Sequence, residues 1–414
     1  MIFLAYLPEI AGFLLLIMMS TQLPEVGPFL ILGEFAIVAL LAARYTTTLV
    51  DVVLKWWWLM LAPIIALISS LWSEAPGLSA RYASQLLFTC FVGLFLARLL
   101  TPRRYITVLM VAMFVFSILC ILNGRQGTSA DGFVLIGLTG SKNQLGYVAQ
   151  ILFMAALAVL MMRVQSMPLR WIAILSLPLG AYLLAGTNSS TAVLMAIGGS
   201  FTLLGLWWAE RFPPAGRIWA LLGLAVVASP LILLAPEIND AINQFVFGTL
   251  NKDPTLTGRT ELWAIADTLI AQKPWLGWGF QSVWLGDSST AIGLKRIIGF
   301  DGRSFHFHDS FRQAAVDTGY VGLAAFAGVM IAVGLASLRT LLLRPNVANS
   351  YFVILFILMV MRAFTDMLLG PFSIHTLLYF ACALYALSSQ GEGVDAQTTP
   401  APLRWAPPFR AAAR

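Results

Sequence analysis

Apolar runs long enough to cross a bilayer recur along almost the whole chain, and this feature constrains the fold more than any other. A transmembrane helix needs about 20 mostly apolar residues, and such runs follow one another up to residue 388. Charged residues make up only 11% of the chain, against roughly 25% in an ordinary globular domain. The sequence therefore predicts an all-α integral membrane protein and excludes a soluble fold.

Reading the apolar runs against the polar breaks predicts about 12 transmembrane helices. The first run has no basic segment before it and no small-residue cleavage site, so we expect a retained helix. The expected spans are residues 3–20, 28–43, 53–71, 84–100, 105–122, 143–162, 169–187, 190–209, 216–235, 317–338, 350–364 and 370–388. Together they form a membrane domain over residues 1–388, and residues 389–414 are predicted to be a flexible tail.

Basic residues gather in alternate short loops, and this asymmetry predicts the orientation of the chain. The predicted cytoplasmic turns hold Arg44, Arg98, Arg103, Arg104, Arg163, Arg170, Arg211, Arg217, Arg339 and Arg344. The short loops of the other face hold only Arg81, Arg125, Lys142 and Arg362. We therefore expect both termini in the cytoplasm, with the protein in a bacterial inner membrane.

The same loops account for the net charge of +6, so the charge does not indicate nucleic-acid binding. Cys90, Cys120 and Cys382 all lie in apolar segments. They predict neither a disulfide framework nor a CxxC metal site. We expect no cofactor and no nucleic-acid partner, and the lipid bilayer as the surroundings.

Residues 236–316 form the longest break in hydrophobicity, and the predicted orientation places them in the periplasm. A connection much longer than about 15 residues is usually functional or disordered. Trp263, Trp275, Trp278 and Trp284 make this loop too aromatic for a solvated tether. We therefore expect the loop to be structured and to carry the chemistry.

The first candidate site within the loop is residues 256–280, LTGRTELWAIADTLIAQKPWLGWGF. Its apolar residues fall at the spacing of one helix face: Leu262, Ile265, Ala266 and Leu269. This pattern predicts a short amphipathic helix on the membrane surface, with Arg259 in its first turn. An arginine there opposes the helix dipole unless an anion binds at the same end. Arg259 is therefore either a phosphate clamp or a solvated surface residue.

Two of the three histidines, His306 and His308, stand one residue apart, and Asp309 and Ser310 follow as candidate N-caps of the next helix. The pair could serve as metal ligands, as a base, or as hydrogen-bonded interface residues. The surrounding sequence completes no tetrahedral ligand set, which argues against a metal. Arg303 and Arg312 nearby favour a neutral imidazole, the form that a general base needs.

Two further groups of polar residues stand at the same predicted face. Lys142 and Asn143, in the segment GSKNQLG, open a span, where a lysine is either an interfacial anchor or a second charge in an anionic pocket. Arg362 and Asp366 are spaced i, i+4 at the end of another span, and we interpret them as a structural ion pair.

At these residues the sequence resembles the O-antigen ligase and polysaccharide polymerase superfamily of membrane glycosyltransferases. The hallmark of that family is matched by His308 and Asp309, nine residues, and then Gly319, Tyr320, Val321 and Gly322. The segments TGRTELW, PWLGWGF and GSKNQLG continue the resemblance, the last toward the exopolysaccharide branch. The chain departs from the family at Asp309, where Asn, Ser or Gln is usual, and at Ser190, where an arginine is expected.

The resemblance implies transfer of a glycan from an undecaprenyl-diphosphate donor to an acceptor sugar hydroxyl, by a metal-independent, inverting reaction without a cofactor. It implies catalytic roles for Arg259, on the diphosphate, and for His308, on the acceptor proton. The tryptophans and Phe280 would offer faces on which sugar rings stack. The substrate-binding candidates are Lys142, Arg303, His306, Asp309, Arg312 and Tyr320.

Three functions remain to be distinguished. A polymerase of surface polysaccharide repeat units is the first expectation, because GSKNQLG resembles exopolysaccharide enzymes. An O-antigen ligase that uses lipid A core as acceptor is the alternative, and a lipid-linked glycan transporter or flippase is the third. A transporter would show two matching halves, which the sequence does not. A flippase and a chain-length regulator are the protein partners that a polymerase would have.

Overall fold

The computed structural model describes residues 6–129, 132–162, 166–213, 215–219, 223, 259–298 and 305–388. Within these residues, eight helical segments are long and apolar enough to cross a membrane, and three further apolar helices are shorter. The prediction of an all-α integral membrane protein is thereby confirmed. The expected span over residues 216–235 lies mostly outside the described residues, as does the tail from 389 to 414.

The long segments begin with α3 (Gly27–Arg44) and with a run over Thr46–Leu71 that contains α4 (Thr46–Trp56) and α5 (Leu61–Ile68). They continue with α6 (Pro76–Leu99), α7 (Pro102–Asn123), α8 (Lys142–Met161), α9 (Met167–Thr187), α10 (Ser190–Ala209) and α15 (Ser310–Leu343). The shorter apolar helices are α2 (Leu7–Ser20), α16 (Val347–Ala363) and α17 (Ile374–Ser388). Each of these helices corresponds to an expected span. The bounds of α10 are those predicted, and those of the others differ at one or both ends by up to eight residues.

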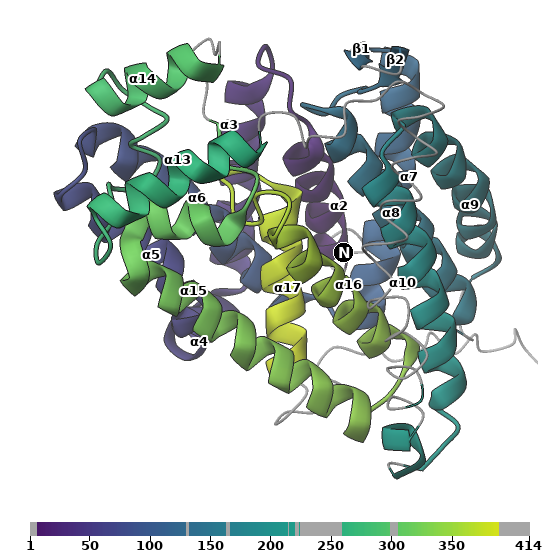
Figure 1. The fold of residues 1–414 in the computed structure, drawn as a ribbon. Helices are drawn as coiled ribbons and strands as arrows, with labels where there is room; N and C mark the ends of the chain where they lie inside the picture. The colour runs from purple at the N-terminus through teal and green to yellow at the C-terminus, as the bar shows by residue number, and fades with distance from the viewer. Residues whose placement is uncertain are drawn as a thin grey trace, which may run out of the picture.

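Helices α8 and α17 lie inside the bundle, α8 against α7, α9 and α10, and α17 against α6 and α16 (Figure 1). Close packing between α6 and α17 depends on Gly93, where an added Cβ would stand 2.6 Å from the backbone oxygen of Leu377. Small residues at such crossings let helix backbones approach, which is how membrane helices gain packing contacts. The middle of the bundle is thus a closely packed core.

One end of the bundle carries an additional layer, made of α13 (Arg259–Gln272) and α14 (Ser289–Ile298), and a hairpin of β1 (Gln126–Ser129) and β2 (Gly132–Leu135) stands at the same end (Figure 1). The predicted face of α13 is confirmed, because Leu262, Ala266 and Leu269 are buried. The layer has its own small core, to which Trp278 and Trp284 also belong. These two tryptophans are therefore packing residues and do not offer free faces to sugars, whereas Trp275 is exposed.

Candidate active site

The histidine motif and the PWLGWGF segment are held together by their backbones. Helix α15 is interrupted at Gly319, whose φ is 63°, and the segment that follows α13 crosses it there. The crossing is closed by backbone hydrogen bonds: Trp278 N to Val316 O at 2.9 Å, Gly279 N to Asp317 O at 2.9 Å, and Tyr320 N to Pro274 O at 2.7 Å. A Cβ on Gly319 would stand 2.2 Å from the carbonyl of Trp275. This crossing gives a physical reason for a glycine eleven residues after His308.

His308 itself has a strained backbone, with φ at 53°, in the left-handed region that non-glycine residues avoid. Asp309 confirms its predicted role as the N-cap of α15, since its carboxylate accepts hydrogen bonds from the backbone N–H groups of Phe311 and Arg312. Strain of this kind persists where the surroundings fix it, and it gathers at functional sites. The backbone thus fixes the point at the start of α15 from which the His308 side chain projects.

Asp366, in the loop after α16, stands behind both histidines. Its Oδ1 is 3.7 Å from His306 Nε2 and 4.0 Å from His308 Nδ1. Ser310 fixes this arrangement, because its hydroxyl donates to the Asp366 carbonyl and accepts from Leu368 N, both at 2.8 Å. The start of α15 and the loop after α16 therefore form one unit.

The tautomer of His306 follows from its contacts. The backbone N–H of His308 donates to His306 Nδ1 at 3.1 Å. The proton of the neutral His306 ring must then be on Nε2, the nitrogen that faces Asp366. This imidazole is oriented by its neighbours on both sides.

Arg362 holds the Asp366 carboxylate, with Nη2 2.7 Å from Oδ2, and this confirms the predicted ion pair. Burial alone would raise the pKa of Asp366, but the Arg362 guanidinium and the nearby imidazoles outweigh it and hold that pKa well below its usual range. Asp366 is therefore an anion at neutral pH. The negative charge favours a positive charge on His306 or His308 if either ring accepts a proton.

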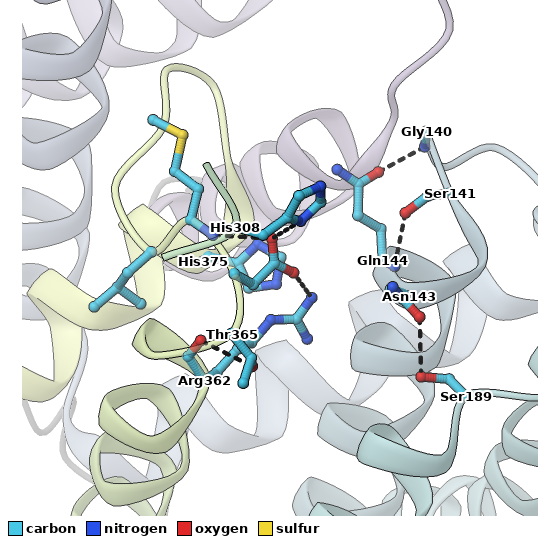
Figure 2. A network of polar contacts seen from close by, with 12 residues as sticks. Gly140, Ser141, Asn143, Gln144, Ser189, His308, Arg362, Thr365 and His375 are labelled. Carbon is cyan, nitrogen blue, oxygen red and sulfur yellow. Dashed lines mark hydrogen bonds and ion pairs between the residues drawn. The ribbon is translucent and has the colours of Figure 1, made fainter. Parts of the chain in front are cut away.

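The opposite side of the site is formed by α8. The ring of Tyr147 lies 3.9 Å from the ring of His375, and the Arg362 guanidinium lies 4.7 Å above Tyr147. One turn before Tyr147, Asn143 accepts a hydrogen bond from the Ser189 hydroxyl, just before α10. Figure 2 shows Asn143, Gln144 and Ser189 facing His308, Arg362 and His375. The GSKNQLG element therefore lies on the side that faces the histidine cluster.

The remaining predicted residues are distributed as follows. Arg312 pairs with Asp267 at 2.9 Å and with Asp309 at 2.7 Å, so two carboxylates balance its charge. Tyr320 is exposed just after the kink, and its ring forms a T-shaped contact with the ring of Trp275. Lys142 is the first residue of α8. Arg259 begins α13, where only its backbone is described, and Arg303 lies outside the described residues.

His306, His308 and Asp366 place three ligand atoms within 4.8 Å of one another, a spacing that a metal ion could use. The hydrogen bonds fit a metal poorly. A metal on His306 Nε2 would require that nitrogen to lose its proton while Nδ1 still accepts one, which leaves an anionic ring. The Asp366 carboxylate already pairs with the Arg362 guanidinium, which supplies the positive charge that a metal ion would bring. The group therefore fits a hydrogen-bonding, proton-accepting role better than a metal site.

Sequence reasoning did not place three of these residues in the site: Asp366, Arg362 and His375. For Arg362 and Asp366, the i, i+4 spacing alone is enough to explain why two opposite charges are present, so the sequence indicates only a structural ion pair. The signal that could have found them was the presence of two charges and the third histidine close together at a membrane depth where polar residues usually line a cavity.

Comparison with known proteins adds two findings. Residues 173–327, which include α13 and the histidine motif, match the O-antigen ligase family. The chain is also similar to the exopolysaccharide production protein ExoQ of Rhizobium meliloti (strain 1021), with 29% identity over 329 residues, covering 77% of this chain and 74% of the relative.

Proposed function

We propose, from the confirmed resemblance of this chain to the O-antigen ligase and polysaccharide polymerase superfamily, that it polymerises repeat units of a surface polysaccharide. It is a multi-pass bacterial membrane protein. The donor would be a glycan on undecaprenyl diphosphate, and the acceptor a sugar hydroxyl. The observation that carries the proposal is His308, strained in its backbone and backed by the Asp366 anion.

In the proposed reaction, the acceptor hydroxyl oxygen attacks the anomeric carbon of the donor sugar. The bond from that carbon to the diphosphate oxygen breaks, and the lipid diphosphate leaves with the electron pair. His308 takes the hydroxyl proton, and the imidazolium that forms lies 4.0 Å from the Asp366 carboxylate. Attack from the face opposite the diphosphate inverts the anomeric centre.

The leaving diphosphate needs fixed positive charge. Arg259, in the first turn of α13, is proposed as one cation, because the helix N-terminus adds its partial positive charge to the guanidinium. Lys142, in the first turn of α8, is proposed as the second in place of the missing arginine at position 190. Arg312 is the weaker candidate, since Asp267 and Asp309 already balance its charge. His306, Asp309 and Tyr320 would shape the acceptor side, and Arg303 stays a candidate outside the described residues.

The proposal includes an orientation, with the α13 layer in the periplasm and both termini in the cytoplasm. A reporter fused within residues 240–300 should report the outer compartment, and one fused after Arg344 the cytoplasm. A cytoplasmic signal from the first fusion would reject the orientation and, with it, the proposed site of transfer.

The chemical analysis of surface polysaccharide from a deletion strain tests the function. A polymerase predicts loss of polymer and accumulation of single repeat units. Uncapped lipid A core with polymer still attached to its carrier lipid would instead indicate the O-antigen ligase. Unchanged polysaccharide would reject both. A flippase and a chain-length regulator are proposed partners of the polymerase, and their deletion should change chain supply or length and leave the linkage as it is.

A further inference from the structure

The ring of Tyr147, in α8, contacts two groups of the site that come from other helices. Its centroid lies 3.9 Å from that of the His375 ring, at the start of α17, and the Arg362 guanidinium, at the end of α16, lies 4.7 Å from it. Tyr147 is only 1% exposed, so both contacts are made away from water. The proton transfer proposed above gives this ring no role.

The Arg362 guanidinium has few contacts that could fix its position. Its Nη2 bonds one oxygen of Asp366 at 2.7 Å, and its Nε is buried without a hydrogen-bond partner among the described residues. A guanidinium held by one such bond can rotate about it, whereas one that also lies over an aromatic face is restrained by that face. The ring of Tyr147 therefore supplies a second contact that keeps Arg362 against Asp366.

The position of Arg362 matters because it sets the charge behind the histidines. The side chains that interact electrostatically with Asp366 are those of Arg362, His306 and His375. Of these, only the guanidinium is charged at every pH. If it moved away from the carboxylate, Asp366 would become a less balanced anion 4.0 Å from His308.

The contact with Arg362 uses the face of the Tyr147 ring and does not use its hydroxyl. The Tyr147 Oη has no hydrogen-bond partner in the part of the chain that the structure describes, so it adds no bond to the guanidinium. A phenylalanine would keep an aromatic face for the cation, whereas an aliphatic side chain would fill part of the space without attracting it. This difference separates a positioning role from simple packing.

We propose that Tyr147 is a positioning residue of the reaction: it holds Arg362 where the guanidinium balances Asp366, and it thereby sets how readily His308 accepts a proton. The inference rests on the proposed function, because Tyr147 acts on transfer only through His308. It gives α8 a part in the proton transfer besides the charge of Lys142 that is proposed for the diphosphate.

Turnover-pH profiles of the purified full-length protein in detergent test the proposal. Tyr147→Phe should keep turnover within about twofold. Tyr147→Leu and Tyr147→Met should lower it about tenfold. Both should move the acidic limb to higher pH by about half a unit, since His308 holds its proton more tightly beside an anion that has lost its counter-charge. The wild-type turnover and profile in either folded aliphatic variant would overturn the proposal, and one misfolded variant leaves the other to decide.

Tyr105→Leu is the matched control for the loss of a buried ring. Tyr105, in α7, is 0% exposed, its Oη also lacks a hydrogen-bond partner among the described residues, and its ring contacts are with Phe352 and Tyr385. We expect this variant to lose stability as the aliphatic Tyr147 variants do. Its turnover should stay within about twofold of the wild type, with the acidic limb unmoved. The same drop and the same shift in Tyr105→Leu would show that any lost core ring causes them, and would overturn the assignment to Tyr147.

A double-mutant cycle tests the contact without requiring glycan transfer. The loss in free energy of unfolding caused by Arg362→Ala should be smaller in the Tyr147→Leu background than in the wild type, because the contact between the two side chains is already absent there. Equal losses would reject the contact.

The two hypotheses fail in different ways. If the cycle shows the coupling but the protein transfers no glycan from any lipid-linked donor, the contact holds and the polymerase proposal fails. If transfer occurs and the aliphatic variants keep the wild-type turnover and profile, the positioning role alone fails.

Discussion

The site has two walls: the first is the start of α15, next to His308, and the second is formed by α8 with the end of α16 and the start of α17. The buried polar groups of the two walls differ in whether they have hydrogen-bond partners within the protein. In the first wall, Gln313, Asp317 and Ser310 are all bonded to neighbouring side chains or backbone. In the second, Tyr147 Oη, His375 Nε2 and Arg362 Nε are buried without a hydrogen-bond partner among the described residues.

Buried polar atoms without a protein partner are uncommon, and each calls for a physical explanation. The difference between the walls suggests a division of roles. The first wall is a fixed frame that orients His308, whereas the second keeps hydrogen-bonding capacity toward the space where a polar substrate would bind. Mutations should therefore act on the first wall through geometry and on the second through charge and binding.

The largest effect is expected from removing one partner of the buried pair that joins the two walls. Arg362→Ala should lower the free energy of unfolding by about 3 kcal/mol, because the half-buried Asp366 carboxylate, 23% exposed, loses the buried guanidinium that balances its charge. Lys55→Ala is the matched control: its side chain is 58% exposed and its partner Asp51 still pairs with Arg98, so we expect at most about 1 kcal/mol. The free energy of unfolding of each variant is measured on protein solubilised in detergent. Equal losses of this free energy in the two variants would remove the contrast between buried and exposed ion pairs.

The Arg362–Asp366 pair also makes the free energy of unfolding depend on pH. The folded state holds the pKa of Asp366 below its unfolded value, so the stabilising contribution is present above about pH 4, the unfolded pKa. It is lost only as the pH falls further, through the folded pKa. Wild-type unfolding curves should therefore show no loss from this pair between pH 8 and 5.

A smaller effect is expected from Asp366→Asn, which keeps the shape of the side chain and removes the charge behind the histidines. Turnover should fall by about 10- to 100-fold, because the His308 imidazolium loses its counter-ion. The acidic limb of the turnover-pH profile, where turnover rises as His308 loses its proton, should move to lower pH, since an imidazolium without a nearby anion releases its proton more easily. A drop in turnover with an unchanged pH profile would mean that Asp366 only supports the fold.

The smallest effect is expected from metal removal. Because His306 Nδ1 accepts the His308 N–H and Arg362 already holds Asp366, exhaustive chelation should leave the turnover of the purified enzyme within about twofold. Loss of turnover on chelation, restored by one divalent ion, would make His306, His308 and Asp366 ligands and reverse the interpretation of this group.

The features of these walls that depend on adjacent residues can be predicted from the sequence, whereas those that depend on how distant helices pack cannot. The membrane helices, the α13 face and the Asp309 cap follow from periodicity and cap chemistry, which adjacent residues determine. The meeting of His308 with Asp366, 58 residues later, depends on how α15 and α16 pack, and no spacing rule contains it. The burial of Trp278 and Trp284 escaped prediction for the same reason, because the loop has a core of its own.

The role of His308 as the group that accepts the acceptor proton is the central claim, and one paired measurement tests it most directly. On the same detergent-solubilised, folded protein, donor-lipid binding and glycan turnover are measured for the wild type and for His308→Ala. We expect turnover to fall by about 10²- to 10⁴-fold, with donor binding nearly unchanged, as for the loss of a general base. Wild-type turnover in the folded His308→Ala protein would contradict the claim and leave His308 as an interface residue.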